Sequence, residues 1–222
     1  WSSKIKWFAK SSGTTNAKSK FIPVSDESLE DCHYAAGKAL LCMYLNNNPN
    51  SQLFTGKSLR LGGSKSPYEK NGTFYGDLSA ILIDNMPFWA EFSSTPSNKT
   101  SLMEDWNYKI EAIINETVNE NVTSLAGVPS WMLVLLNRIL KESKKEYISE
   151  IWPNLEVYFH GGVSFKPYLN QYDAIINKDS MQYYEIYNAS EGFFAIQYEN
   201  NSNELLLMLD YGIFYEFIPM KT

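Results

Sequence analysis

The feature that most constrains the fold is an alternation of short apolar strands and amphipathic helices in the second half of the chain. Apolar runs bounded by turn residues predict strands at residues 122–126, 155–159, 183–187, 193–198, 205–209 and 213–218. Apolar residues at helical spacing predict helices at 129–145 and 167–176. Alternation followed by hairpins predicts an α/β fold, with a mixed sheet, flanking helices and an appended antiparallel strand region.

Two further amphipathic helices are predicted in the first half. One begins near Ser25, whose hydroxyl suits an N-cap, and ends at the asparagine run that precedes Pro49. The other carries its apolar residues between positions 102 and 118. A strand at 53–61 and a short helix at 77–83 are also expected, whereas the sequence around that short helix has no clear pattern.

Composition excludes several classes of function. The 222 residues include 19 basic and 25 acidic side chains, a net charge of −6, which disfavours nonspecific binding of nucleic acid. No apolar run approaches the length of a membrane span, so no membrane association is expected. Cys32 and Cys42 fall about 15 Å apart on one predicted helix, too far for a disulfide, and isolated thiols fit the reducing cytoplasm.

A loop rich in hydroxyl groups lies close to the start of the chain. It consists of Ser11, Ser12, Gly13, Thr14, Thr15, Asn16, Ala17, Lys18, Ser19 and Lys20. Hydroxyls and backbone N–H groups can hold phosphate oxygens, lysine adds positive charge, and a following helix would favour an anion. The loop lacks the Walker A pattern, and its composition also fits an ordinary solvated loop.

A second candidate segment follows the predicted strand at 183–187. An aromatic side chain at a strand end, here Tyr187, can stack on a purine. The carboxylate of Glu191, four residues later, can hold Mg²⁺, which prefers oxygen ligands and bridges to substrate phosphates. The alternative is a plain strand turn with a surface glutamate.

The third candidate segment is His160, Gly161 and Gly162, at the carboxyl end of the strand at 155–159. Two glycines there let a flat ligand approach the backbone, and ligands of α/β sheets gather at that edge. A tight turn is the alternative. His160 can be a base or a packed bystander, and His33, inside a predicted helix, is assigned no chemistry. Two histidines and two cysteines assemble neither a Ser/His/Asp triad nor a cluster with metal-ligand spacing.

Taken in chain order, these three segments resemble the motifs of the adenylate-forming superfamily. The closest resemblance is to the plant auxin-responsive (Gretchen Hagen) family of acyl acid amido synthetases and its bacterial relatives, and it covers nearly the whole chain. The loop resembles Ser-Ser-Gly-Thr-Thr-x-Gly-Lys-x-Lys, with Ala17 in place of a glycine, and 187–191 resembles Tyr-Gly-x-Thr-Glu, with Asn188 in place of the glycine. His160 and the two glycines resemble the glycine pair of the adenine pocket, and residues 127–131 and 151–155 also look typical of the family.

The resemblance implies a reaction in two steps, with ATP and Mg²⁺ as cofactors. A carboxylic acid attacks the α-phosphate of ATP to give an acyl-adenylate and pyrophosphate. An amine, typically an amino acid, then attacks the activated carbonyl to form an amide. Such chemistry depends mostly on positioning and on neutralisation of charge.

The resemblance also implies a role for each matching residue. The residues that would steady the phosphates of ATP are Ser11, Ser12, Gly13, Thr14, Thr15, Lys18 and Lys20. Tyr187 would stack on adenine, Gly161 and Gly162 would meet its edge, Ser190 would meet the α-phosphate, and Glu191 would hold Mg²⁺. The candidates for the acyl pocket are Val128, Trp131, Met132 and Leu135, although plain core packing fits Met132 and Leu135 equally well.

The family's Tyr-Arg-x-Gly-Asp segment, whose aspartate binds ribose, is not found, and Asp210-Tyr211-Gly212 is only a superficial echo of it. The chain begins at Trp1 and does not include the family's C-terminal domain with its lysine. We therefore expect residues 1–222 to be part of the N-terminal adenylating domain, inactive alone. An acid–thiol ligase that uses coenzyme A and a non-catalytic nucleotide-binding module remain the alternatives.

Overall fold

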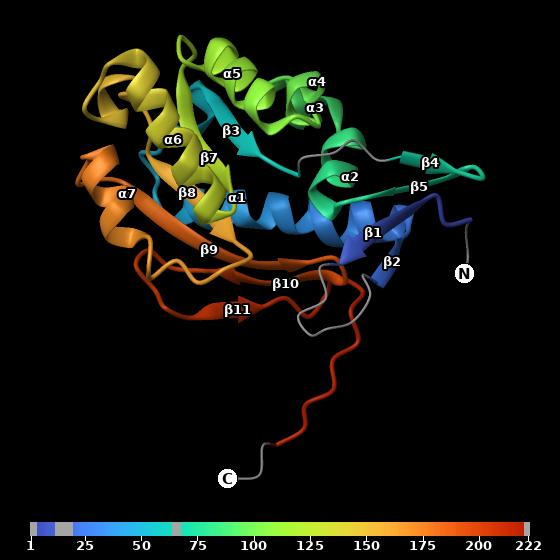
Figure 1. Ribbon diagram of the computed structural model, residues 1–222. Coiled ribbons are helices and arrows are strands. Elements are labelled where there is room, and N and C mark those ends of the chain that lie inside the picture. The colour runs from blue at the N-terminus through green and yellow to red at the C-terminus, as the bar shows by residue number, and fades with distance from the viewer. Residues whose placement is uncertain (1–3, 12–19, 64–67, 220–222) are drawn as a thin grey trace.

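The computed structural model describes residues 4–11, 20–63 and 68–219, and in these ranges it has two sheets (Figure 1). The larger sheet has seven strands, in the order β11-β10-β9-β8-β7-β3-β6. Its strands are β3 (Lys57–Leu61), β6 (Ser94–Thr95), β7 (Val122–Gly127), β8 (Val157–Gly161), β9 (Gln182–Ala189), β10 (Gly192–Gln197) and β11 (Leu205–Leu207). The mixed α/β fold expected from the sequence is confirmed.

The antiparallel strands continue the larger sheet instead of forming an appended one. Strands β3, β7, β8 and β9 pair in parallel, and β10 and β11 then pair antiparallel at one edge. The strand expected at 213–218 is wrong, because this segment forms no ladder and extends away from the body (Figure 1). The hydroxyl of Tyr215 donates to the Met208 carbonyl oxygen at 3.0 Å.

The smaller sheet has four strands in the order β2-β1-β5-β4. Its strands are β1 (Trp7–Ser11), β2 (Lys20–Val24), β4 (Tyr68–Lys70) and β5 (Thr73–Gly76). Local sequence patterns do not indicate this sheet, because its strands are short and β1 pairs with β5, which is distant in sequence. Ala9 of β1 and Val24 of β2 are wholly buried and share a core cluster with Ile81.

The helices were largely predicted. They are η1 (Ser28–Tyr34), α1 (Ala35–Asn47), α2 (Leu78–Asp84), α3 (Phe88–Phe92), α4 (Asn98–Ser101), α5 (Trp106–Thr117), α6 (Pro129–Ser143) and α7 (Leu169–Ile176), with short 3₁₀ turns at η2 (Leu53–Thr55) and η3 (Ile148–Glu150). The expected strand at 53–61 is therefore a turn followed by β3. Ser25 caps its helix as predicted, since its hydroxyl oxygen accepts from the Ser28 N–H at 3.1 Å.

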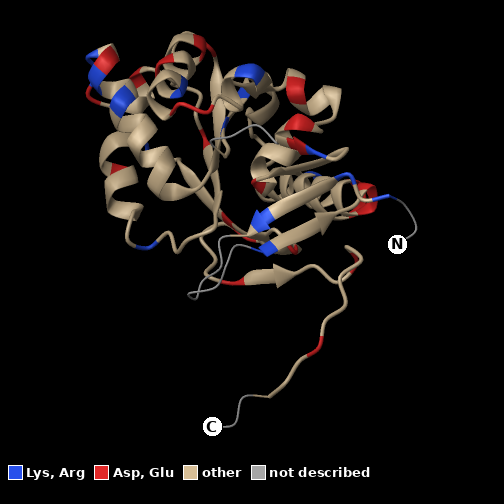
Figure 2. Cartoon of the chain, turned by 45° about the vertical axis from the view of Figure 1, so that its right-hand side comes forward, with Lys and Arg blue, Asp and Glu red and all other residues tan. Residues whose placement is uncertain are grey.

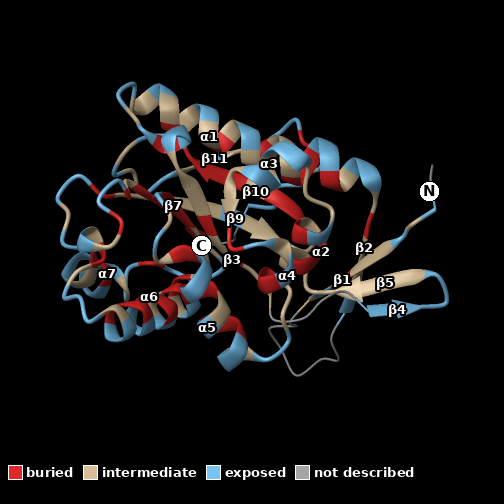
Figure 3. Cartoon of the chain, turned by 90° about the horizontal axis from the view of Figure 1, so that it is seen from above, coloured by how far each residue is buried: buried red, intermediate tan, exposed pale blue. Residues whose placement is uncertain are grey.

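Helices α5, α6 and α7 close one face of the larger sheet. Met132 and Leu135 of α6 are wholly buried against Leu59 of β3 and Leu125 of β7. Figure 3 shows buried residues gathered on the sheet and on the inner sides of the helices. We call this side the packed face.

Segment η1 and helix α1 run across the other face. Tyr44 of α1 makes edge-to-face ring contacts with Phe159 of β8 and Tyr184 of β9. The helix covers β8, β9 and β10, whereas β3 and β7 carry the small or polar side chains Ser58, Arg60, Ser124 and Ala126 toward this side. We call this side the open face.

Candidate active site

A cavity of about 850 Å³ lies on the open face. Alternate residues of a strand share a face of the sheet, and such residues line the cavity. They are Ser58 and Arg60, Ser124 and Ala126, Phe159 and Gly161, and Ile186 and Asn188. The cavity extends to the carboxyl ends of the parallel strands, where Gly62, Val128 and Ser190 line it. This is the edge at which ligands of α/β sheets bind.

Helices supply the remaining walls of the cavity, which are largely apolar. His33 and Tyr34 come from η1, Leu41 from α1, Leu78 from α2 and Trp89 from α3. Aromatic and aliphatic walls with few polar groups are typical of small-molecule sites.

The two glycines at the end of β8, Gly161 and Gly162, are required for different physical reasons. A side chain at Gly161 would place its Cβ 2.5 Å from the Ile186 carbonyl oxygen, so this glycine permits the close pairing of β8 and β9. Gly162 has φ +83°, a conformation that favours glycine, and both residues line the cavity. The glycines can therefore form a tight turn and also let a ligand approach the backbone.

His160, directly before the glycines, points to the packed face. It is 2% exposed and its ring stacks on Phe165, with the centroids 4.0 Å apart. Burial lowers the pKa of its imidazole to about 4. His160 is thus a packed, neutral side chain and not a base in the cavity.

The segment 187–191 forms the end of β9 and the turn into β10. Asn188, Ala189 and Ser190 line the cavity. Tyr187 alternates to the opposite side of the strand, where it is 57% exposed and packs on Phe194, with the ring centroids 5.1 Å apart. Glu191 is exposed in the turn. The structure therefore brings Ser190 beside the glycine turn but places the Tyr187 ring outside the cavity wall.

The hydroxyl-rich loop joins two strands. Ser11 and Lys20 are cross-strand partners at the ends of β1 and β2. Ser12, Gly13, Thr14, Thr15 and Lys18 lie outside the described residues. A strand, and not a helix, directly follows the loop, so the expected contribution of a helix N-terminus to phosphate binding is absent at Lys20.

The candidates for the acyl pocket divide between the two faces. Val128 and Trp131 line the cavity, whereas Met132 and Leu135 are 0% exposed in the core of the packed face. Successive helical residues project about 100° apart, so neighbours on α6 face different environments. The expectation that Met132 lines the pocket is corrected accordingly.

Three nitrogen-bearing titratable side chains in the cavity wall were not predicted, His33, Arg60 and Lys38. His33 is 4% exposed, and burial lowers its pKa to about 4, although a side-chain hydrogen bond with Asn188 opposes this shift. Burial also lowers the pKa of Arg60 to about 10, and its Nη2 donates to Asn98 Oδ1 at 3.3 Å. The Lys38 Nζ lies 5.7 Å from the centroid of the Trp89 ring. The wall therefore holds two basic side chains and a buried imidazole, together with the carboxylate of Asp77.

A buried lysine supports the cavity edge from the packed side. Lys109 of α5 is 0% exposed, and its Nζ donates to the carbonyl oxygens of Gly62 at 3.2 Å and Gly63 at 2.7 Å. Burial lowers its pKa to about 8. A lysine within an apolar helical pattern was the one sequence signal of this contact.

The comparisons with known proteins agree with this arrangement. The family model described as the GH3 family N-terminal domain matches residues 1–181. The chain belongs to the GH3 family. The resemblance stated from the sequence motifs is thus confirmed at the level of the family. No curated protein matches the sequence significantly.

Two solved structures share the fold of this GH3-family chain. One, the AtGH3.15 acyl acid amido synthetase in complex with 2,4-DB, has a TM-score of 0.69 and 14% identity, over 90% of this chain and 43% of that one. Another structure, of the GH3.15 acyl acid amido synthetase, has a TM-score of 0.67 and 13% identity, over 86% of this chain and 44% of that one. The chain therefore spans less than half of these synthetases.

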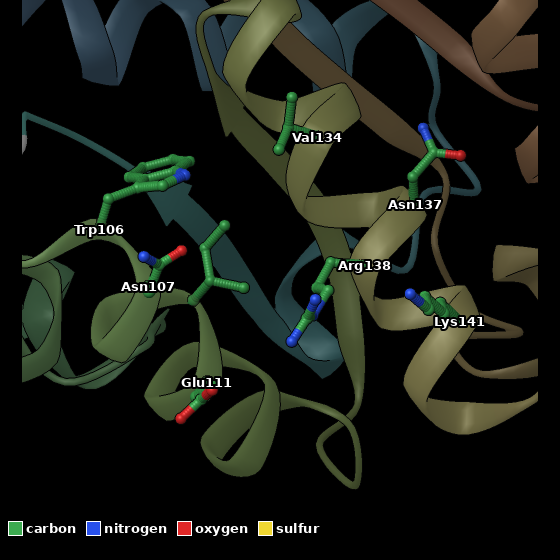
Figure 4. A pocket seen from close by; sticks show the side chains of 8 residues that line it. Trp106, Asn107, Glu111, Val134, Asn137, Arg138 and Lys141 are labelled. Atoms are coloured by element: carbon green, nitrogen blue, oxygen red, sulfur yellow. The ribbon is translucent and has the colours of Figure 1, made fainter.

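A second groove of the GH3-family chain is lined by none of the predicted site residues that the structure describes. It lies between α5 and α6, has a volume of about 450 Å³ and is lined by Trp106, Val134 and Arg138 among others (Figure 4). Arg138 is paired there with Glu142, Nε to Oε1 2.5 Å. The Trp106 ring, which also lines the larger cavity, packs edge-on against Trp131, with the centroids 4.9 Å apart.

The charge and hydropathy of the described residues limit the kinds of site that they could form. Figure 2 shows basic and acidic residues interspersed over the helices, without a uniform basic face in that view. No group of three or more acidic, histidine or cysteine side chains in the described part of the chain could hold a metal ion by itself. No helix within those ranges is long and apolar enough to cross a membrane.

Proposed function

We propose that residues 1–222 form part of the N-terminal domain of an ATP-dependent ligase, which activates a carboxylic acid as its acyl-adenylate and transfers it to an amine. The observation that carries this proposal is the single cavity, which joins the glycine turn, Ser190 and the Trp131 wall at the carboxyl edge of the sheet. Membership of the GH3 family and the two similar structures, both amido synthetases, support it.

The nucleotide would bind at the carboxyl ends of β8 and β9. Gly161 and Gly162 would offer backbone groups to the adenine edge, and the Ser190 hydroxyl would bond the α-phosphate. Tyr187 would have to turn from its contact with Phe194 to stack on adenine. Ser11, Lys20 and the loop between them would hold the β- and γ-phosphates.

The carboxylic acid would lie along Val128 and Trp131 in the apolar part of the cavity. Lys38 and Arg60 are the cations of the wall and would attract its carboxylate. In the first step a carboxylate oxygen bonds to the α-phosphorus while the bond to pyrophosphate breaks. In the second step the amine nitrogen bonds to the carbonyl carbon and loses a proton. The bond between this carbon and the bridging oxygen breaks, and AMP leaves with that oxygen.

The exposed carboxylate of Glu191 fits a Mg²⁺ site, because this ion is usually held by one or two carboxylates together with substrate phosphates. When bound, the ion would neutralise phosphate charge during the first step. We expect Glu191→Ala to lower the rate of ATP–pyrophosphate exchange at least about a hundredfold, while Glu204→Ala, an exposed carboxylate past the β10 turn, leaves it unchanged. Equal rates in the two variants would refute the role of Glu191.

ATP–pyrophosphate exchange with a panel of carboxylic acids, measured on the full-length protein, tests the proposed function. Exchange that depends on one class of acid is expected. Amino acids and coenzyme A as acceptors then separate an amido synthetase from an acid–thiol ligase. If no acid supports exchange and ATP does not bind, the chain is a non-catalytic module instead.

We place the reaction in the cytoplasm, because the free thiols of Cys32 and Cys42 fit a reducing compartment. The 222 residues alone should show no turnover, since the family's ribose-binding segment and C-terminal lysine are not among them. Multiple turnovers by the isolated chain would contradict this expectation.

A further inference from the structure

His33 is a buried polar side chain that faces the cavity beside Asn188. It lies on η1, it is 4% exposed, and it lines the cavity. Apart from the interaction with Asn188, neither Nδ1 nor Nε2 has a hydrogen-bond partner within the ranges that the structure describes. Leaving a buried donor or acceptor unpaired costs about 1–3 kcal/mol, so the imidazole favours a ligand that completes its hydrogen bonds.

Asn188 lies beside His33 and has the same property. Apart from the interaction with His33, its Oδ1 is buried without a partner in the described part of the chain, and its side chain lines the same cavity. The amide forms a side-chain hydrogen bond with His33 that raises the pKa of the imidazole. One such bond leaves the second ring nitrogen and the rest of the amide for a ligand, so the two side chains together present donors and acceptors to one point of the cavity.

The backbone holds these two side chains in place. The residue before His33, Cys32, accepts a hydrogen bond at Sγ from the Phe193 N–H at 3.3 Å, and Phe193 is the cross-strand partner of Asn188. The π-helical turn of η1 interrupts an otherwise α-helical run from residue 26 to 47, a distortion that is frequent at functional sites.

The other histidine of the chain shows what a purely structural role looks like. His160 is equally buried and its Nδ1 also lacks a partner among the described residues, but its ring stacks on Phe165 and it does not line the cavity. Among the described ring contacts none involves His33. Packing therefore accounts for His160 but not for the orientation of His33.

We propose that His33 and Asn188 determine substrate specificity by hydrogen-bonding one uncharged polar group, such as a hydroxyl, on an otherwise apolar carboxylic acid. This inference rests on the proposed function. The surrounding wall, including Leu41, Phe159 and Ile186, is apolar and suits a hydrocarbon body. An imidazole and an amide each offer a donor and an acceptor, whereas a second charge buried here would lack a counter-charge at either group.

Binding of matched acids to the chain, measured by isothermal titration calorimetry, tests this pair. The probes are 3-phenylpropanoic acid with 3-(4-hydroxyphenyl)propanoic acid, and decanoic acid with 10-hydroxydecanoic acid. We expect the hydroxylated member of at least one pair to bind about tenfold or more tightly than its partner, and His33→Phe or Asn188→Leu to bring that ratio to about one. His160→Phe, the matched control, should preserve it.

A spectrum of ¹⁵N-labelled histidine gives a readout that needs no variant. The chain has two histidines, so the spectrum contains two imidazoles. The hydroxylated acid should shift the ring nitrogens of His33 and leave those of His160 unchanged, and the unhydroxylated acid should shift His33 less. Equal shifts with both acids, a ratio that survives both substitutions, or no binding by either hydroxylated acid would overturn the proposal.

Two outcomes separate this inference from the proposed function. If the hydroxylated acid binds through His33 but no acid supports ATP–pyrophosphate exchange, the proposed function fails and the pair stands as a ligand site. If exchange occurs and the His33 and Asn188 variants change only the affinity for ATP, the pair belongs to the nucleotide site and the specificity role is refuted.

Discussion

The two faces of the seven-stranded sheet are built from the same strands but differ in what covers them. On the packed face, α5, α6 and α7 bury a continuous apolar core that includes Met132 and Leu135. On the open face, η1 and α1 cover only β8 to β10 and leave a cavity above β3 and β7. One face thus supplies stability, and the other supplies a place for ligands.

Even adjacent residues can lie on different faces of the sheet. Trp131 and Met132 are neighbours on α6, yet Trp131 is 54% exposed at the cavity and Met132 is 0% exposed in the core. His33 and His160 are both buried, yet only His33 meets the cavity. Residue type alone therefore does not reveal which face a side chain serves.

The largest expected effect comes from Met132→Ala. Removing this core side chain should lower the free energy of unfolding by about 2–5 kcal/mol through lost burial and a new void. Trp131→Ala, its neighbour, should cost less than about 1 kcal/mol because it is half-exposed, but should weaken acid binding. Urea denaturation of both variants checks this, and equal losses would show that the faces do not differ.

The two histidines should make the protein sensitive to acid. Both have a pKa lowered to about 4 from 6.5, so the unfolded chain binds more protons between these values, and stability falls as pH drops from 6.5 to 4. His33→Phe and His160→Phe should each remove part of the acid-induced loss in the free energy of unfolding, at most about 3 kcal/mol per histidine. A saturating acid ligand should alter only the contribution of His33. Unfolding curves at several pH values measure both effects.

Lys109 connects the faces, since it lies on α5 and holds the Gly62–Gly63 turn of the cavity. Its pKa is lowered to about 8 from 10.5, so the unfolded chain binds more protons in this range and stability rises with pH there. Between pH 8 and 9.5 wild type should gain about 2 kcal/mol relative to Lys109→Met. If the free energy of unfolding changes with pH equally in the two proteins, burial does not lower the pKa of Lys109.

The smallest expected effect concerns the cap of α5. Asp105 accepts from the N–H groups of Asn107 at 2.9 Å and Tyr108 at 3.0 Å. Asp105→Ala should lower the free energy of unfolding by about 1 kcal/mol. Acid binding in the open cavity should not change, and a change in affinity would show that the packed face also shapes the ligand site.

The sequence predicted the packed face better than the open one. Helical spacing identified α6 and its core residues, and apolar runs identified β7, β8 and β9, because local periodicity reflects burial. The smaller sheet, the pairing of β1 with β5 and the route of 213–218 depend on contacts distant in sequence, which no local pattern encodes.

The sequence predicted the motif residues of the candidate site but not the other side chains that line the cavity. The glycine turn and Ser190 line the cavity, and the motif order indicated the GH3 family. His33, Arg60 and Lys38 meet only through the crossing of α1 over the sheet, so their positions gave no signal. The position of the Tyr187 ring was also missed, since strand alternation turns it away from Asn188.

Hydrogen–deuterium exchange, compared with and without saturating ATP, Mg²⁺ and a carboxylic acid, tests most directly whether the open face is the ligand site. We predict slower exchange at η1, at Gly161–Gly162 and at residues 186–190, with α7 on the packed face unchanged. Protection confined to α7 or to the α5–α6 groove, with the cavity segments unaffected at saturation, would contradict it.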